Sequence, residues 1–229
     1  MDEKQKKSLI FLHGWGITPS AYAADISALE ERFNVVVPYF RGDKFEKNAF
    51  EVKKILDENG IGRAVVVGHS AGSITAILFA HLFPERVISI ILVAPVGIGR
   101  RRSIYTWINR WIYHVFLFFF SSKRASLIFL LRLSRNFFGQ MFSHLVSLYR
   151  ETRAIMSTDL SVYYKEIQVP ILLIWSKDDK IISKEIAENI NLMNKNATVL
   201  FVSGDHDWIK LFPRQFLQEI TRFLEKKIK

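Results

Sequence analysis

A serine lies between two glycines in the segment GHSAG, residues 68–72, directly after the apolar run AVVV. With a strand before this segment and a helix after it, Ser70 would sit on a sharp turn at the carboxyl end of the strand. A serine hydroxyl exposed there can act as a nucleophile, and Gly68 and Gly72 let the backbone turn without side-chain clashes. The alternative is a tight glycine turn around a buried serine that has no chemical role.

A serine hydroxyl is a poor nucleophile unless a base removes its proton. Among six histidines, His206 follows the last apolar run on a glycine-containing loop, where a base can reach Ser70. For the others we expect local hydrogen bonding or packing: His13, His69, His81, His114 and His144. The base in turn needs a carboxylate that fixes its tautomer. The loop after ILLIW offers both Asp178 and Asp179, and spacing alone does not choose between them.

Acyl chemistry at this serine also needs two N–H donors for the negative charge that develops on the carbonyl oxygen. The N–H of Ala71, directly after the serine and at the start of the expected helix, is one candidate. The loop after the first apolar run, LHGWG, supplies the second candidate, the N–H of Trp15. A structural reading of HGWG, as a glycine turn with a packing tryptophan, stays open.

Apolar runs of strand length alternate with helix-like segments and must position these side chains. The runs are rich in Val, Ile and Leu and do not alternate with polar residues, which is typical of parallel strands covered on both faces. The alternation predicts an α/β fold with a doubly wound, mostly parallel sheet of about six strands. The runs cover residues 8–12, 34–39, 64–68, 87–94, 171–175 and 198–202.

Residues 96–165 interrupt this order with an aromatic, basic segment that has helical periodicity and no strand signal. We expect a helical cap of two to four helices, inserted into a core made of residues 1–95 and 166–229. Ten basic residues lie between Arg100 and Arg153 against one acidic residue, in a chain of net charge +10. Its aromatic residues are candidates for an apolar acyl pocket, or else pack the cap onto the core; the candidates are Trp107, Trp111, Phe119 and Phe138.

Taken together, the pieces resemble the α/β-hydrolase superfamily. The matching stretches are LHGWG, VVVGHSAG, VPILLIWSKDD and GDHDWIKLFP, in the family's order and over most of the chain outside the insertion. The resemblance implies a cap at this place and an acid three positions after a glycine. Ser176 replaces that glycine, so the resemblance selects Asp179. In comparison with the family, we expect its first two antiparallel strands to be absent, and Ser73 replaces a frequent glycine after the turn.

We therefore predict a serine hydrolase that cleaves carboxylic esters or lactones with apolar acyl groups through Ser70, His206, Asp179 and an acyl-enzyme. The alternative is a peripheral membrane or interaction protein that uses the basic aromatic cap, which could also pair with a second copy of itself. The pattern implies no metal and no organic cofactor. Nucleic-acid binding is not expected, because the basic residues interleave with long apolar runs.

The expected location is cytoplasmic. The 229-residue chain contains no cysteine, which fits a reducing compartment. We recognise no secretory signal near its start and no window with the roughly 18 apolar residues that a membrane-spanning helix needs.

Overall fold

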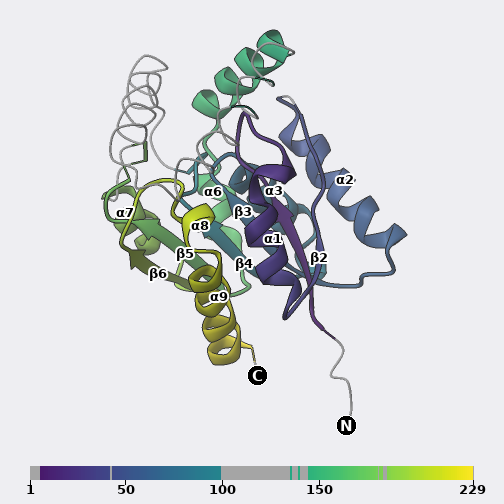
Figure 1. The fold of residues 1–229 in the computed structure, drawn as a ribbon, viewed down its shortest axis with the longest axis vertical. Helices are drawn as coiled ribbons and strands as arrows, with labels where there is room; N and C mark the ends of the chain where they lie inside the picture. Colours follow the sequence, from purple (N-terminus) through teal and green to yellow (C-terminus); the bar gives the residue numbers. More distant parts are fainter. Residues whose placement is uncertain are drawn as a thin grey trace.

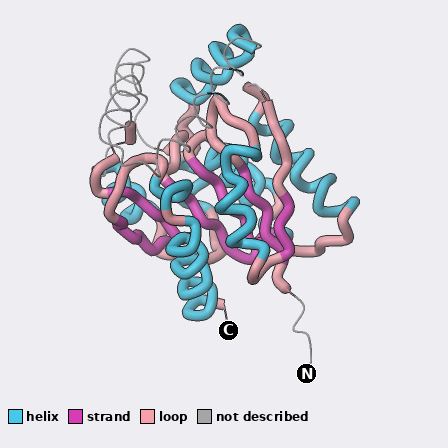
Figure 2. The backbone as a smooth tube through the Cα atoms, viewed as in Figure 1, coloured by secondary structure: helices cyan, strands magenta, loops and turns pink. Residues whose placement is uncertain are grey.

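The computed structural model describes residues 6–41, 43–98, 135, 139, 144–179, 181–182 and 185–228. Within these residues six strands form one parallel sheet in the order β2-β1-β3-β4-β5-β6, seen in Figures 1 and 2. The prediction of a doubly wound parallel sheet is confirmed. The strands are β1 (Ser8–Leu12), β2 (Asn34–Val36), β3 (Ala64–His69), β4 (Val87–Val93), β5 (Ile171–Ser176) and β6 (Ala197–Val202).

Both faces of the sheet are buried, which explains why its strands show no polar alternation. Successive side chains of a strand point to opposite faces. In β1, Ile10 and Leu12 belong to one hydrophobic cluster, whereas Leu9 and Phe11 belong to the other. The sequence of such a strand is apolar throughout because each face meets its own layer of helices.

The helices form those two layers, in front of the sheet and behind it in Figure 1. One face packs against α2 (Phe45–Glu58), α3 (Gly72–Leu82), α6 (Ser161–Glu166) and α7 (Glu185–Met193). The other face packs against α1 (Ala23–Glu30), α8 (Trp208–Leu211) and α9 (Pro213–Lys227). Two short 3₁₀ turns, η1 (Pro19–Tyr22) and η2 (Pro84–Arg86), precede α1 and β4.

Strand β2 is shorter than the sequence predicts. The apolar run suggested a strand over 34–39, but the pairing with β1 ends at Val36. Pro38 follows two residues later and has no N–H to donate to a neighbouring strand. The chain therefore leaves the sheet at this edge and continues as a loop.

The later part of the predicted insertion lies against the core. A helix occupies residues 144–157, and its Ile155 is buried in the same cluster as Tyr164 of α6. The N–H of Leu160 donates to the carbonyl of Gly97 at 2.7 Å, which ties the two ends of the segment together. Within the described residues, no helix combines the length and the apolar character needed to cross a membrane.

The sheet order brings two functional loops together. β1 lies between β2 and β3, so the chain leaves β1 in one direction and returns on its other side. Ligands of open α/β sheets bind at such a switch point, outside the carboxyl ends of the strands. Here the HGWG loop follows β1 and the GHSAG turn follows β3, so the two loops are neighbours.

Candidate active site

Ser70 occupies a strained turn between β3 and α3. Its φ is +50°, in the left-handed region that residues other than glycine seldom adopt. The glycines on either side make the turn possible by close approach. A Cβ on Gly68 would lie 2.8 Å from the Cα of Ser73, and a Cβ on Gly72 would lie 2.2 Å from the carbonyl oxygen of Leu12. A side chain at either position would collide with neighbouring backbone atoms, so both positions require glycine.

Ser73 has a role of its own at the position where the family often has glycine. Its side chain is fully buried, and its hydroxyl bonds the carbonyl oxygens of Ser70 and Val96 and accepts from the N–H of Val96 at 3.0 Å. The hydroxyl thus connects the turn to the loop after β4. Serine is thus accommodated at this position because its side chain is small and because its hydroxyl forms these hydrogen bonds.

The structure brings Ser70, His206 and Asp179 together from three separate loops. The Ser70 hydroxyl lies 3.2 Å from Nε2 of His206, and Nδ1–H of His206 donates to Oδ2 of Asp179 at 2.8 Å. His206 and Asp179 are buried, whereas Ser70 is half-buried and partly open to solvent. An accessible hydroxyl, an imidazole and a buried carboxylate therefore form one continuous relay.

The two candidate carboxylates have different surroundings. Asp179 Oδ1 accepts from the N–H groups of Ile181 at 2.8 Å and Ile182 at 2.7 Å, which leaves Oδ2 directed at His206. Asp178 instead lies beside Gly204, whose N–H donates to it at 3.4 Å. The residue beside the imidazole is thus the one that the family resemblance selects.

The surroundings of His206 favour its protonated form. Burial lowers the pKa of the imidazole, but the charge and hydrogen bond of Asp179, together with the charge of Asp207, outweigh it and raise the pKa above its usual value. Such a histidine accepts a proton more readily than a free imidazole.

The two proposed N–H donors belong to segments next to the nucleophile. Ala71 directly precedes α3, where the helix dipole favours negative charge. Trp15 lies on the HGWG loop, and a Cβ on the preceding Gly14 would be 3.5 Å from the Cβ of Ser70. The indole Nε1–H of Trp15 donates to the carbonyl of Leu148 at 3.2 Å, which joins this loop to the helix at 144–157.

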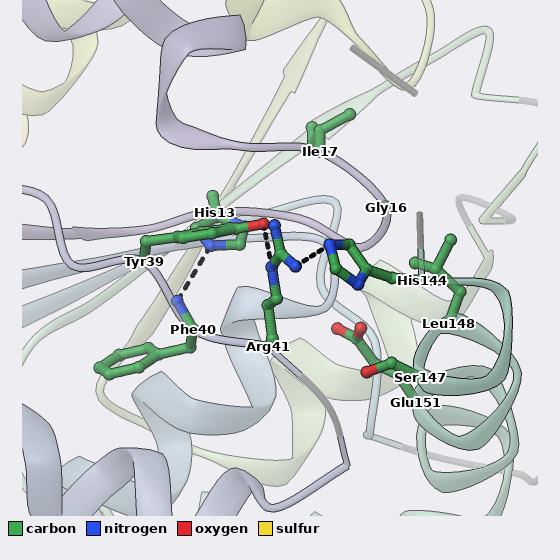
Figure 3. Close-up of a pocket in the computed structure, with 10 residues that line it drawn as sticks. All are labelled: His13, Gly16, Ile17, Tyr39, Phe40, Arg41, His144, Ser147, Leu148 and Glu151. Carbon is green, nitrogen blue, oxygen red and sulfur yellow. Dashed lines mark hydrogen bonds between the residues drawn. The ribbon is translucent and has the colours of Figure 1, made fainter. Parts of the chain in front are cut away.

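A pocket lies beside this loop, between the HGWG segment, residues 39–41 and the helix at 144–157 (Figure 3). Arg41 is one of the residues that line it. Its guanidinium donates hydrogen bonds to the hydroxyl of Tyr39 and to Nε2 of His144. His13 faces Tyr39 and accepts from the N–H of Phe40 at 3.3 Å. The pocket is thus lined by a cation as well as by apolar groups. Arg41 was not predicted from the sequence.

The predicted acyl-pocket residues Trp107, Trp111, Phe119 and Phe138 lie outside the described residues. The expected membrane contact and self-association of the cap rest largely on the same segment. Among the residues that are described, no group of His, Asp or Glu side chains has the arrangement of a metal site.

A second set of buried polar groups was missed by the sequence analysis. Tyr22 is fully buried, and its hydroxyl lies between the N–H of Gly14 at 2.9 Å and Nδ1 of His69 at 2.7 Å. His69 was expected to pack or bond locally, and its partner is 47 residues away in the chain. No local signal marks Tyr22, because only the fold brings the two residues together.

The fold agrees with comparisons with known proteins. The family described as "Alpha/beta hydrolase family" matches residues 9–219. The chain belongs to the alpha/beta hydrolase family. The predicted membership is confirmed, and the match covers the sheet and all the loops described above.

Individual relatives of this alpha/beta hydrolase are distant. A dihydrolipoyllysine-residue acetyltransferase component of an acetoin cleaving system from Cupriavidus necator is 33% identical over 103 residues, or 41% of this chain; the alignment spans only 28% of that relative. A pimeloyl-[acyl-carrier protein] methyl ester esterase from Wigglesworthia glossinidia brevipalpis is 22% identical, with 96% of this chain and 94% of the relative covered. A hydrolase from Pseudomonas aeruginosa PA01 has a similar structure, with a TM-score of 0.75, 20% identity, and 96% and 90% coverage.

Proposed function

We propose that this alpha/beta hydrolase cleaves carboxylic esters or lactones with apolar acyl groups. The observation that carries the proposal is the unbroken relay from the Ser70 hydroxyl through His206 to Asp179, at 3.2 and 2.8 Å. A relay of this geometry activates a serine for attack on an acyl carbon. Among the relatives, one whole-length match is named as a methyl ester esterase, which supports an ester as the substrate class.

In the proposed reaction, His206 Nε2 takes the Ser70 proton as Oγ attacks the carbonyl carbon. The negative charge that forms on the carbonyl oxygen is bound by the N–H groups of Trp15 and Ala71. The imidazolium, stabilised by Asp179, then gives its proton to the leaving alkoxide, and an acyl-enzyme remains. Water attacks the acyl carbon, its proton goes to His206 and on to Ser70 Oγ, and the acid is released.

The test is Ser70→Ala, assayed with a series of nitrophenyl esters and with lactones of increasing ring size. We expect ester turnover to fall to the rate without enzyme, and a fluorophosphonate probe to label the wild-type protein at Ser70 only. The matched control is Ser157→Ala, because Ser157 is exposed on the helix at 144–157. Undiminished turnover by Ser70→Ala would refute the proposal.

A second candidate function is contact with an anionic membrane surface, and the helix at 144–157 carries the observation that favours it. Leu145, Val146 and Tyr149 are 64%, 65% and 57% exposed, and Arg150 and Arg153 on the same helix are exposed as well. Exposed apolar side chains next to basic ones are typical of helices that lie at a lipid interface. Such contact is compatible with hydrolysis of an ester.

Flotation with phosphatidylglycerol vesicles tests this second candidate. We expect the wild-type protein to float with the vesicles and the double variant Leu145→Glu, Val146→Glu to remain in solution. Leu192→Glu is the matched control, since Leu192 is 84% exposed on α7. Flotation that is absent in the wild type, or lost equally in the control, would contradict it.

A further inference from the structure

One buried chain of hydrogen bonds links the HGWG loop, the GHSAG turn and the loop that carries His206. It runs from the N–H of Gly14 to the hydroxyl of Tyr22 at 2.9 Å, and from that hydroxyl to Nδ1 of His69 at 2.7 Å. Nε2 of His69 then lies 3.4 Å from the carbonyl oxygen of His206. Tyr22 is fully buried and His69 is 2% exposed, so water does not compete for these bonds.

The chemistry of the end groups sets the direction of the chain. The backbone N–H of Gly14 can only donate, and the carbonyl oxygen of His206 can only accept. If His69 carried its proton on Nδ1, that proton would point at the Tyr22 oxygen and the lone pair of Nε2 would face a carbonyl oxygen. All contacts are satisfied when Tyr22 donates to Nδ1 and the neutral imidazole of His69 carries its proton on Nε2.

The electrostatic surroundings keep both groups in these forms. Burial lowers the pKa of His69 well below its usual value, and the positive charge of Lys210 lowers it further, so the imidazole stays neutral. Burial also raises the pKa of Tyr22 well above its usual value, so the hydroxyl keeps its proton. Both shifts thus favour the neutral forms that the hydrogen-bond geometry requires.

We infer that Tyr22 is a positioning residue, whose hydroxyl sets the distance between the two N–H donors that bind the oxyanion. Gly14 directly precedes Trp15, and His69 directly precedes Ser70 and Ala71. A single oxygen atom thus holds the HGWG loop against the turn that carries the nucleophile. The inference rests on the proposed function in that it assigns these donors to an oxyanion.

The surroundings of the Tyr22 ring allow its hydroxyl to be removed alone. The ring packs on Phe11 with centroids 4.9 Å apart and against the edge of His69 at 5.6 Å. Phenylalanine fills the same space, so Tyr22→Phe keeps these contacts. It leaves the N–H of Gly14 and Nδ1 of His69 buried without their partner, and a buried group in that state is costly enough to move a loop.

Tyr164→Phe is the matched control. Tyr164 is also fully buried, on α6, but within the described part of the chain its hydroxyl has no hydrogen-bond partner. For Tyr22→Phe we expect kcat for nitrophenyl esters to fall about 10- to 100-fold with KM changed less than two-fold, because loss of one oxyanion donor costs about 10²- to 10³-fold and displacement of a donor costs less. Tyr164→Phe should leave both constants unchanged.

A sulfur substitution in the substrate separates positioning from a general loss of stability. Sulfur accepts hydrogen bonds poorly, so an intact oxyanion site favours an ester over the matching thionoester. We expect this preference to shrink in Tyr22→Phe and to stay at the wild-type value in Tyr164→Phe. An unchanged preference, or a loss of activity that lies entirely in KM, would overturn the inference.

Two further measurements test the inference if Tyr22→Phe does not fold, or if Ser70 proves not to be a nucleophile. If Tyr22→Phe does not fold, His69→Asn should retain more activity than His69→Leu, because the amide oxygen of Asn can accept from Tyr22; equal activities would overturn the inference. ¹⁵N NMR of the wild-type histidine rings needs no turnover. It should show His69 protonated on Nε2, and protonation on Nδ1 would overturn the inference even if Ser70 proves not to be a nucleophile.

Discussion

Replacing Asp179 by asparagine should abolish most of the proposed esterase activity by changing the tautomer of His206. Oδ1 of Asp179 accepts two backbone N–H groups, from Ile181 and Ile182 at 2.8 and 2.7 Å. In the variant, these donors hold the amide oxygen in the same place. The amide NH₂ must then face Nδ1 of His206, where the carboxylate oxygen was.

The size of the effect follows from that geometry. Turning the amide round would set its NH₂ against two N–H donors and lose two buried hydrogen bonds, at about 1–3 kcal/mol for each group left unsatisfied. The asparagine side chain therefore keeps this orientation. Nδ1 of His206 then accepts a hydrogen bond from the amide NH₂, and Nε2 carries the ring proton. A protonated Nε2 cannot take the Ser70 proton. In a serine protease relay, this change costs about 10⁴-fold in kcat, or about 5.5 kcal/mol of transition-state stabilisation.

The assay is steady-state hydrolysis of a nitrophenyl ester, with thermal unfolding measured in parallel. Asp178→Asn is the matched control, since the carboxylate of Asp178 accepts from the N–H of Gly204 at 3.4 Å and an amide oxygen can still accept there. We expect its kcat to stay within about two-fold of the wild type, as for a surface change away from the site. If Asp179→Asn kept more than a tenth of the wild-type kcat, or if the control lost as much, the tautomer argument would be refuted.

Three other predictions concern pH and packing. Burial raises the pKa of Asp25 to about 8, and neither carboxyl oxygen has a partner among the described residues. Folded protein therefore keeps this proton between about pH 4 and 8 while unfolded protein loses it, so stability falls as pH rises, by about 1.4 kcal/mol per unit from this group. Asp25→Asn should remove that fall, and urea unfolding at pH 5 and 8 measures it; an equal pH dependence in both proteins would contradict the assignment. Gly72→Ala should destabilise the fold by about 1–3 kcal/mol or more, because its Cβ would meet the carbonyl oxygen of Leu12 at 2.2 Å. Gly62→Ala, with open space around the added Cβ, should unfold at the wild-type temperature; similar losses in both would count against contact as the cause. Finally, kcat/KM should fall as pH drops through the pKa of His206, with a midpoint above 6.5, because burial is outweighed by the neighbouring carboxylate; a midpoint below 6.5 in a pH–rate profile would disagree.

The sequence alone determined the sheet and the turn around Ser70, for local physical reasons. Apolar runs without polar alternation can be stable only between two layers of helices, and β1 and β3 lie buried in that way. The glycines at 68 and 72 lie where backbone segments approach closely, so their spacing around a serine predicts a tight turn between a strand and a helix. Pro213 begins α9, where its missing N–H does no harm.

Only the tertiary structure decided which side chains meet. The residues alone left Asp178 and Asp179 open; family resemblance selected Asp179, and the folded chain directs its Oδ2 at His206 because two backbone N–H groups hold the other oxygen. No sequence pattern around Tyr22 indicated that its hydroxyl would lie between Gly14 and His69. Local spacing predicts strands, helices and turns because these depend on near neighbours, whereas a hydrogen bond across 47 residues exists only after the sheet has brought its ends together.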